Sequence, residues 1–246
     1  MLLADFVNHK IVKLTDTVSN KKLSLVELAT FTSGLPKNFR YTDYDMRGSP
    51  FAQVTLKNAR KFIRDPINMD ESGRFHYSNV SIVALAEYLQ QVGKQDYRDL
   101  LDKRILKPLG LFDTKFIPSP SQKIKGYQDG ASVSHWDFEG VFASAGGLWS
   151  TPKDMARLLD KITSPPKGLD FIGTSLTTRF ESKDQTMGLG WFKLNGGRIV
   201  FAAGETAGFS SVMIFSGKSR FGVYLLINES HTPVFDLALQ LYLGLL

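Results

Sequence analysis

One stretch of the chain, "MGLGWFKLNGGRIVFAAGETAGFSSVMIFSGKSRFGVYLLINES" (187–230), decides the fold. It holds three apolar runs rich in β-branched and aromatic residues, at 187–203, 209–217 and 221–230. Asn195-Gly196-Gly197 breaks the first run as a hairpin turn does, and a second turn is expected at Gly217–Arg220. The stretch therefore predicts an antiparallel meander.

Segments whose apolar residues have helical spacing precede and follow this meander in the sequence. Ser78 or Asn79 lies near the start of one such segment, Gly93 ends it, and Ser150 or Thr151 can cap another. The expected helices cover 2–12, 23–32, 51–64, 78–93, 97–110, 150–162 and the C-terminal "PVFDLALQLYLGLL" (233–246).

This order of elements predicts an α+β fold with a reduced antiparallel sheet from about 187–230, packed by the first and last helices. The 246 residues are enough for a single domain, 1–246. We expect a mainly helical lobe over about 30–150 and an α/β lobe formed by 1–29 plus 151–246.

Composition excludes several classes of protein. No apolar run approaches the roughly 20 residues of a membrane span, and the absence of cysteine excludes disulfides and thiol chemistry. The net charge of +6 is compatible with an anionic partner. The Lys and Arg residues are scattered along the sequence without a nucleic-acid motif, however, so a solvated basic surface is the preferred interpretation. "MLLADFVNHK" has no basic leader, which predicts a cytoplasmic protein if Met1 is the native start. No metal or organic cofactor is expected, since His9, His135 and His231 lack ligand spacing.

Six stretches together resemble the β-lactamase-related serine hydrolases, which include class C β-lactamases, penicillin-binding DD-peptidases and esterase-like relatives. The resemblance covers almost the whole chain, in family order. The stretches are "LSLVELATFTSGLP" (23–36), "GRFHYSN" (73–79), "LLDKRILKPLGLFDTKF" (100–116), "ASAGGLWSTPKDMARLL" (143–159), "MGLGW" (187–191) and "AGETAGFSS" (203–211).

The resemblance implies a site with three motifs: Ser-x-x-Lys for the nucleophile, Tyr-x-Asn, and Lys-Thr-Gly or His-x-Gly on a strand. It implies that Tyr77 is the proton-transfer tyrosine and that Asn79 orients the substrate. The third motif is degenerate, because Ala202-Ala203 stand where the relatives carry a cation, while Gly204 and Thr206 still fit. Glu205 adds a negative charge nearby, which disfavours an anionic substrate or oxyanion.

The first motif is expected to be missing. In relatives it lies just before the stretch that matches "LLADFVNHKIVKL" (2–14), and this sequence starts at Met1. The spacing occurs elsewhere at Ser19–Lys22, Ser150–Lys153 and Ser164–Lys167. We attribute these to chance, since they are expected in a loop, at a helix cap and in a Pro-Pro turn.

Simpler structural roles compete with these assignments. Tyr77 alone could be a half-buried turn residue with Asn79 capping the helix, and His76 is more readily a surface imidazole than a base. Trp136, Trp149 and Trp191 could line a pocket, although buried packing is preferred.

Three functions remain open from the sequence. The first is a β-lactamase-related domain without acylation activity, a pseudoenzyme whose remnant cleft holds a small molecule or peptide. The second is an active serine hydrolase whose nucleophile lies in a missing N-terminal segment or a partner chain. The third is an interaction module that forms a homodimer through an open sheet edge.

Overall fold

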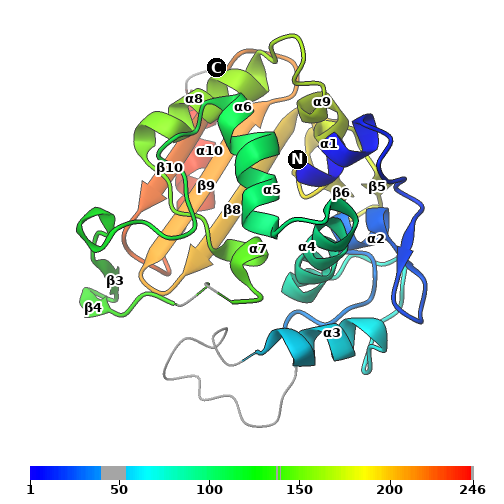
Figure 1. The fold of residues 1–246 in the computed structure, drawn as a ribbon. Coiled ribbons are helices and arrows are strands. Elements are labelled where there is room, and N and C mark those ends of the chain that lie inside the picture. The colour runs from blue at the N-terminus through cyan, green and yellow to red at the C-terminus, as the bar shows by residue number, and fades with distance from the viewer. Residues whose placement is uncertain (40–53, 137, 139, 245–246) are drawn as a thin grey trace.

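The computed structural model describes residues 1–39, 54–136, 138 and 140–244, which form a sheet with helices on both faces (Figure 1). The helices are α1 (Leu2–Asn8), α2 (Leu25–Ala29), α3 (Leu56–Arg64), α4 (Asn79–Gly93), α5 (Tyr97–Leu101), α6 (Lys107–Leu109), α7 (Ala143–Gly146), α8 (Pro152–Thr163), α9 (Phe171–Leu176) and α10 (Val234–Gly244). The strands are β1 (Thr17–Val18), β2 (Leu23–Ser24), β3 (Gly126–Gln128), β4 (Ala131–Val133), β5 (Phe180–Glu181), β6 (Thr186–Met187), β7 (Phe192–Leu194), β8 (Ile199–Thr206), β9 (Phe209–Ser216) and β10 (Gly222–Ile227).

The predicted meander is confirmed as the main sheet. Its strand order is β10-β9-β8-β7-β6-β5, with every neighbouring pair antiparallel. The expected hairpin turn has positive φ at Asn195, Gly196 and Gly197, which glycine and asparagine tolerate best. The sheet begins at Phe180 rather than near residue 187, because two strands of two residues each extend it. Strands of two residues are too short to show the alternation of apolar and polar residues from which a strand is predicted.

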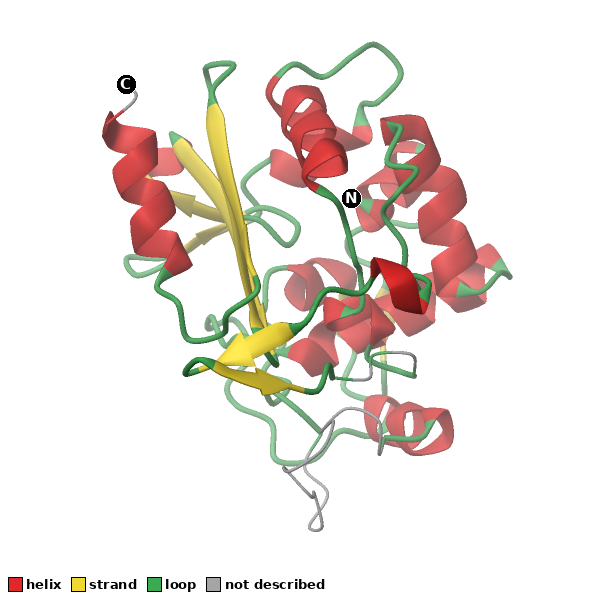
Figure 2. Ribbon diagram, turned by 90° about the vertical axis from the view of Figure 1, so that its left-hand side faces the viewer, coloured by secondary structure: helices red, strands yellow, loops and turns green. Residues whose placement is uncertain are grey.

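The two faces of the sheet pack against different helices (Figure 2). Ile199, Val212 and Ile214 point toward α10 and form a small core with its Val234 and Ala238. The alternate residues Val200, Met213 and Phe215 join the large core that contains α1, α2 and α4. Period-two alternation along β8 and β9 thus separates the two cores.

Several predicted helices have different bounds in the structure. The helix expected over 2–12 ends at Asn8, and Lys10 adopts a left-handed φ of 57°. The segment expected over 23–32 begins as a strand, and Ser24 then starts α2 with a capping box to Glu27. For the segment expected over 51–64, Thr55 caps α3, and residues 51–53 lie outside the described part.

The segment expected as one helix over 97–110 is divided. A π-helical turn, Asp102–Leu106, separates α5 from α6. Pro108 is the second residue after this turn, and a proline lacks the N–H for a regular helical bond. Gly110 then ends α6 with a φ of 74°.

No helix in the described ranges is long and apolar enough to cross a membrane.

Candidate active site

The Tyr-Ser-Asn segment stands at the start of α4 and is fastened to the loop that follows α2. Ser78 is fully buried; its hydroxyl donates to the Pro36 carbonyl at 2.7 Å and accepts from the Ser81 N–H at 3.0 Å. Asn79 donates its backbone N–H to the Lys37 carbonyl at 2.9 Å. Ser78 is therefore the helix cap, and these bonds fix the residues on either side of it.

Tyr77 projects from this rigid turn and keeps 40% of its surface exposed. Its ring packs on Phe31, with centroids 4.8 Å apart, and the Phe31 backbone has a left-handed φ of 58°. Such a φ is unusual for a buried aromatic residue and marks a constrained position. Burial raises the pKa of the Tyr77 hydroxyl above its usual value, so this group keeps its proton at neutral pH.

The side chain of Asn79 has a hydrogen-bond partner in the loop that follows α2. Its side-chain nitrogen donates to the Asn38 side-chain oxygen at 2.9 Å, which leaves the Asn79 carbonyl oxygen available as an acceptor. The amide is thus held in one orientation, as a substrate-orienting group requires.

The third-motif residues lie on β8, linked to Tyr77 through aromatic rings. Phe31 contacts Phe192 on β7 at 6.2 Å, and Phe192 stacks on Phe201 at 5.1 Å, one residue before Ala202. Within the described ranges, no hydrogen bond or ring contact joins Tyr77 directly to β8. The structure therefore brings the two motifs to neighbouring elements, and the ring contacts supply the link.

The strand offers no cation at the third motif. Ala202, Gly204 and Thr206 share one face of β8, paired with Met213, Ser211 and Phe209 of β9. The side chain of Glu205 lies on the opposite face. Its carboxylate accepts the His231 backbone N–H at 3.1 Å. The negative charge of Glu205, expected to repel an anionic substrate, thus lies against the 229–231 loop and not on the face of β8 that contains Gly204.

The other proposed bases and nucleophiles have contacts elsewhere. His76 pairs with Asp70 at 3.2 Å. Ser19 accepts the Lys21 N–H in an exposed turn, and Ser164 caps the end of α8. In all three Ser-x-x-Lys pairs, which lie in the described ranges, no hydrogen bond joins the serine hydroxyl to the lysine ammonium; Ser19 and Lys22 are joined through their backbones alone, the Lys22 N–H donating to the Ser19 carbonyl at 3.2 Å.

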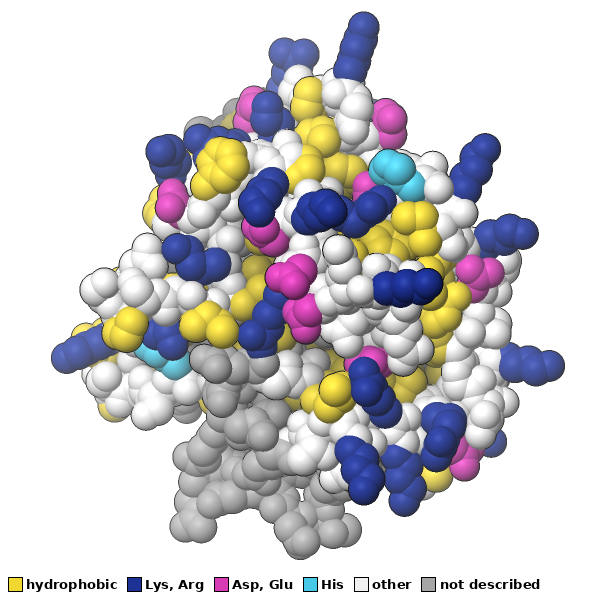
Figure 3. All heavy atoms as spheres, viewed as in Figure 1, with side chains coloured by type: hydrophobic (Ala, Val, Ile, Leu, Met, Phe, Trp, Pro, Cys, Tyr) yellow, Lys and Arg dark blue, Asp and Glu magenta, His cyan; other side chains and the backbone are white. Residues whose placement is uncertain are grey.

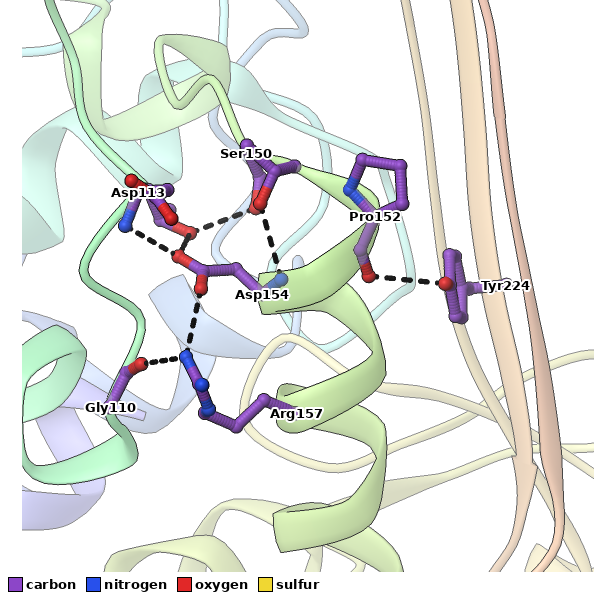
Figure 4. Close-up of polar contacts among 9 residues, drawn as sticks. Gly110, Asp113, Ser150, Pro152, Asp154, Arg157 and Tyr224 are labelled. Carbon is purple, nitrogen blue, oxygen red and sulfur yellow. Dashed lines mark hydrogen bonds and ion pairs between the residues drawn. The ribbon is translucent and has the colours of Figure 1, made fainter.

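Ser150 belongs to a structural network around Asp154 (Figure 4). Its hydroxyl bonds the Thr114 hydroxyl at 2.8 Å, and Thr114 donates to the Asp154 carboxylate at 2.9 Å. Asp154 is fully buried and also accepts from the Asp113 N–H and from Arg157. This network joins α8 to the loop after α6, which accounts for Ser150 without a catalytic role; Thr151 is the cap of α8.

Two polar groups of interest were missed from the sequence. Lys193 on β7 is largely buried, and burial lowers its pKa while Glu181 opposes that effect. Its ammonium bonds Thr178 at 2.8 Å, so it supports β5 rather than Tyr77. Ser144 on α7, which packs on α4, has a buried hydroxyl oxygen without a hydrogen-bond partner in the described structure. Such a group costs free energy until a ligand or water satisfies it. Strand alternation could have indicated Lys193; no sequence signal marks Ser144.

Of the three tryptophans, the structure shows Trp191 buried in the core and Trp149 in contact with two other rings. Trp191 is buried, donates to Ser175 at 3.2 Å and packs on Phe215, which confirms the packing role. Trp149 contacts His135 and Phe209. No cluster of His, Asp or Glu in the described ranges could hold a metal.

Comparisons with known proteins identify a family and several similar chains. The family model described as Beta-lactamase matches residues 1–245. The D-alanyl-D-alanine-carboxypeptidase/endopeptidase AmpH of Escherichia coli is 25% identical over 245 residues, covering 87% of this chain and 60% of the relative. Protein flp of Staphylococcus aureus is 25% identical over 246 residues, covering 90% and 46% respectively. The chain thus spans about half of the length of the curated relatives it matches.

The fold has a counterpart among solved structures. A structure titled as the β-lactamase/D-alanine carboxypeptidase from Yersinia pestis complexed with citrate superposes with a TM-score of 0.77 at 21% identity, covering 98% of this chain and 78% of the other. This likeness establishes the fold.

Proposed function

The chain belongs to the beta-lactamase family, and from that premise we propose that it is a ligand-binding β-lactamase/DD-peptidase-like domain that forms no acyl intermediate on its own serines. The observation that carries this proposal is the pair Ala202 and Ala203 on β8, where the family motif has a cation. Tyr77 and Asn79 remain at a rigid helix start, so we propose that the groups for ligand recognition are kept while those for acylation are lost.

The chemistry supports the loss of acylation. A serine hydroxyl attacks a carbonyl only when a base within hydrogen-bond reach takes its proton. A tyrosine can serve as that base if a nearby cation lowers its pKa. Burial instead raises the pKa of Tyr77 here. At neutral pH its hydroxyl is a hydrogen-bond donor rather than a base.

The ligand class follows from the polar groups and from the relatives' names. The Tyr77 hydroxyl can donate, and the Asn79 carbonyl can accept. These groups suit the amides of a peptide. Relatives are named for D-alanyl-D-alanine carboxypeptidase activity, so we propose a D-alanyl-D-alanine-type peptide or a β-lactam as ligand.

The decisive experiment is intact-protein mass spectrometry after incubation with a penicillin and with a reactive p-nitrophenyl ester. We expect no mass gain, together with saturable binding of a D-alanyl-D-alanine peptide by calorimetry that Tyr77→Ala and Asn79→Ala weaken. Ser219→Ala, in an exposed turn, is the matched control and should bind normally. A single acyl adduct mapped to one serine would overturn the proposal.

A cavity favours a second candidate, an active hydrolase whose nucleophile lies outside these 246 residues or on a partner chain. The cavity, of about 150 Å³, is lined by Met1, Leu3, Ile82 and Tyr97 among others, and α1 has no side-chain cap at this end.

The two candidates separate in a four-way comparison: the chain with or without a family-type Ser-x-x-Lys segment before α1, each with or without Ala202→Lys. The binding-domain proposal expects no ester hydrolysis from the extended chain alone, because β8 still lacks its cation. Hydrolysis by that extended chain would favour the enzyme.

A further inference from the structure

The exposed side of α3 is a basic face. At 100° per residue, Lys57, Arg60, Lys61 and Arg64 fall within an arc of roughly 100° of the helix. Ala59 and Ile63 are buried on the other side, and α3 contains no acidic residue. The charges that look scattered in the sequence are therefore gathered on one side of one helix. Figure 3 shows Lys and Arg side chains collected there, at the lower right.

Most of these cations are not neutralised by the protein. Arg60 bonds the Glu87 carboxylate through two nitrogens, at 2.8 and 2.6 Å. Lys57, Lys61 and Arg64 have no ion pair among the described residues. Three cations therefore remain free to meet an external anion.

The basic face extends into the turn between β1 and β2. The Asn20 N–H donates to the Arg64 carbonyl at 2.7 Å, which places exposed Lys21 and Lys22 beside the C-terminal end of α3. The nearby acids are mostly engaged: Asp70 pairs with His76, Glu71 with Arg74, and Glu27 accepts from Ser24 and Ser72. Asp65, at the end of α3, is also exposed, as are the paired Asp70 and Glu71.

Exposed apolar side chains lie beside the basic face, Leu56 at its flank next to Ile63 and Ile67 after the end of α3. Leu56 begins α3 and is 42% exposed, and Ile67 follows its end and is 62% exposed. Ile67 also lines an open depression of about 570 Å³ together with Lys21 and Lys22, and with Glu27 and Asp70, whose carboxylates are engaged by Ser24, Ser72 and His76. Cations and apolar side chains thus share one surface.

We infer that this surface, formed by α3, Lys21, Lys22 and Ile67, docks on an anionic phospholipid bilayer. Lysine and arginine side chains approach lipid phosphates, while Leu56 and Ile67 enter the boundary between headgroups and acyl chains. The apolar pair favours a bilayer over a soluble polyanion, which offers no apolar phase to receive it. The surface shares no residue with the Tyr77 cleft, so the inference is independent of the proposed function.

The test is co-sedimentation with phosphatidylcholine vesicles, pure or mixed with phosphatidylglycerol. We expect binding only to the mixed vesicles, weakening as salt rises. Each cation near such a surface is worth roughly a five-fold factor, so the triple variant Lys57→Gln, Lys61→Gln, Arg64→Gln should bind about 100-fold more weakly. Ile67→Trp should show a blue shift of its fluorescence in the bound state.

The matched control removes the same charge elsewhere, with Lys167→Gln, Lys183→Gln and Lys218→Gln in exposed loops. Circular dichroism checks that each variant is folded. Equal loss in the control would overturn the inference, because bulk charge would then explain the binding. Equal binding to neutral vesicles, or retention on a polyphosphate resin without vesicle binding, would overturn it as well.

Discussion

Asp154 is the residue on which the packing of α8 depends most. It is fully buried and accepts hydrogen bonds from three groups: the Asp113 N–H, the Thr114 hydroxyl and the Arg157 guanidinium. Removing this buried carboxylate leaves the Asp113 N–H without its acceptor and takes one bond each from Thr114 and Arg157, which keep Ser150 and the Gly110 carbonyl as partners. We expect Asp154→Ala to lower the free energy of unfolding by about 3 kcal/mol, measured by urea denaturation.

The control for this prediction lies on the same helix. Asp160 is exposed on α8, so Asp160→Ala should change the free energy of unfolding by less than about 0.5 kcal/mol. Equal losses in the two variants would show that the network is not what stabilises α8.

Tyr97 predicts how stability responds to alkaline pH. Burial raises the pKa of Tyr97 to about 12, whereas an unfolded tyrosine titrates near about 10. Above about pH 10 the unfolded chain loses this proton while the folded protein keeps it, so the free energy of unfolding falls as pH rises. The Tyr97 contribution is fully present below about pH 10.

Tyr97→Phe should therefore reduce the loss of stability between about pH 8 and about pH 11 by about 1 kcal/mol. Urea denaturation at both pH values measures this difference. An identical decline in wild type and variant would contradict the assignment of the alkaline sensitivity to Tyr97.

At the scale of elements, the start of α4 holds the candidate site in place. Ser78 makes two buried hydrogen bonds, whereas Thr55 caps α3 through a single bond at an exposed position. We expect Ser78→Ala to cost about 2 kcal/mol of unfolding free energy, and Thr55→Ala about 0.5–1 kcal/mol. Ser78→Ala should also weaken ligand binding at Tyr77, since the cap residue fixes the position of the neighbouring Tyr77 side chain. Unchanged binding alongside lost stability would contradict the positioning role.

Elements with strong local signals were predictable. Asn195-Gly196-Gly197 requires positive φ and gave the hairpin, and the apolar spacing of 78–93 gave α4. The α9 helix and strands β5 and β6 were missed because each is short and stabilised by tertiary packing, not by a periodic pattern. Asp129-Gly130 did carry a hairpin signal for β3 and β4, and it was overlooked.

At the scale of the whole molecule, the β10 edge predicts self-association. Ser216 donates to the Phe221 carbonyl, so alternation directs the backbone groups of 223, 225 and 227 toward β9 and those of 222, 224 and 226 outward. No second described strand pairs with β10 between 222 and 227, and "GVYLLI" contains no charge or proline to block pairing.

We expect the wild-type chain to dimerise through this edge, and Leu226→Lys to make it monomeric, as measured by light scattering. Leu226 is 41% exposed, so the change should leave the fold intact. Phe112→Lys, at a residue 72% exposed, is the control and should remain dimeric. A monomeric wild type would rule out edge pairing.

The sequence by itself determined the antiparallel sheet and the helix that follows Tyr77, because turn chemistry and apolar periodicity are local properties, and its resemblance to known motif stretches indicated the kinship. The tertiary structure alone decided that Glu205 faces the 229–231 loop, that Ser150 serves the Asp154 network and that the cations of α3 form one face with Lys21 and Lys22. These facts depend on which distant segments meet. Such meetings are set by packing of the whole core, which no local pattern encodes.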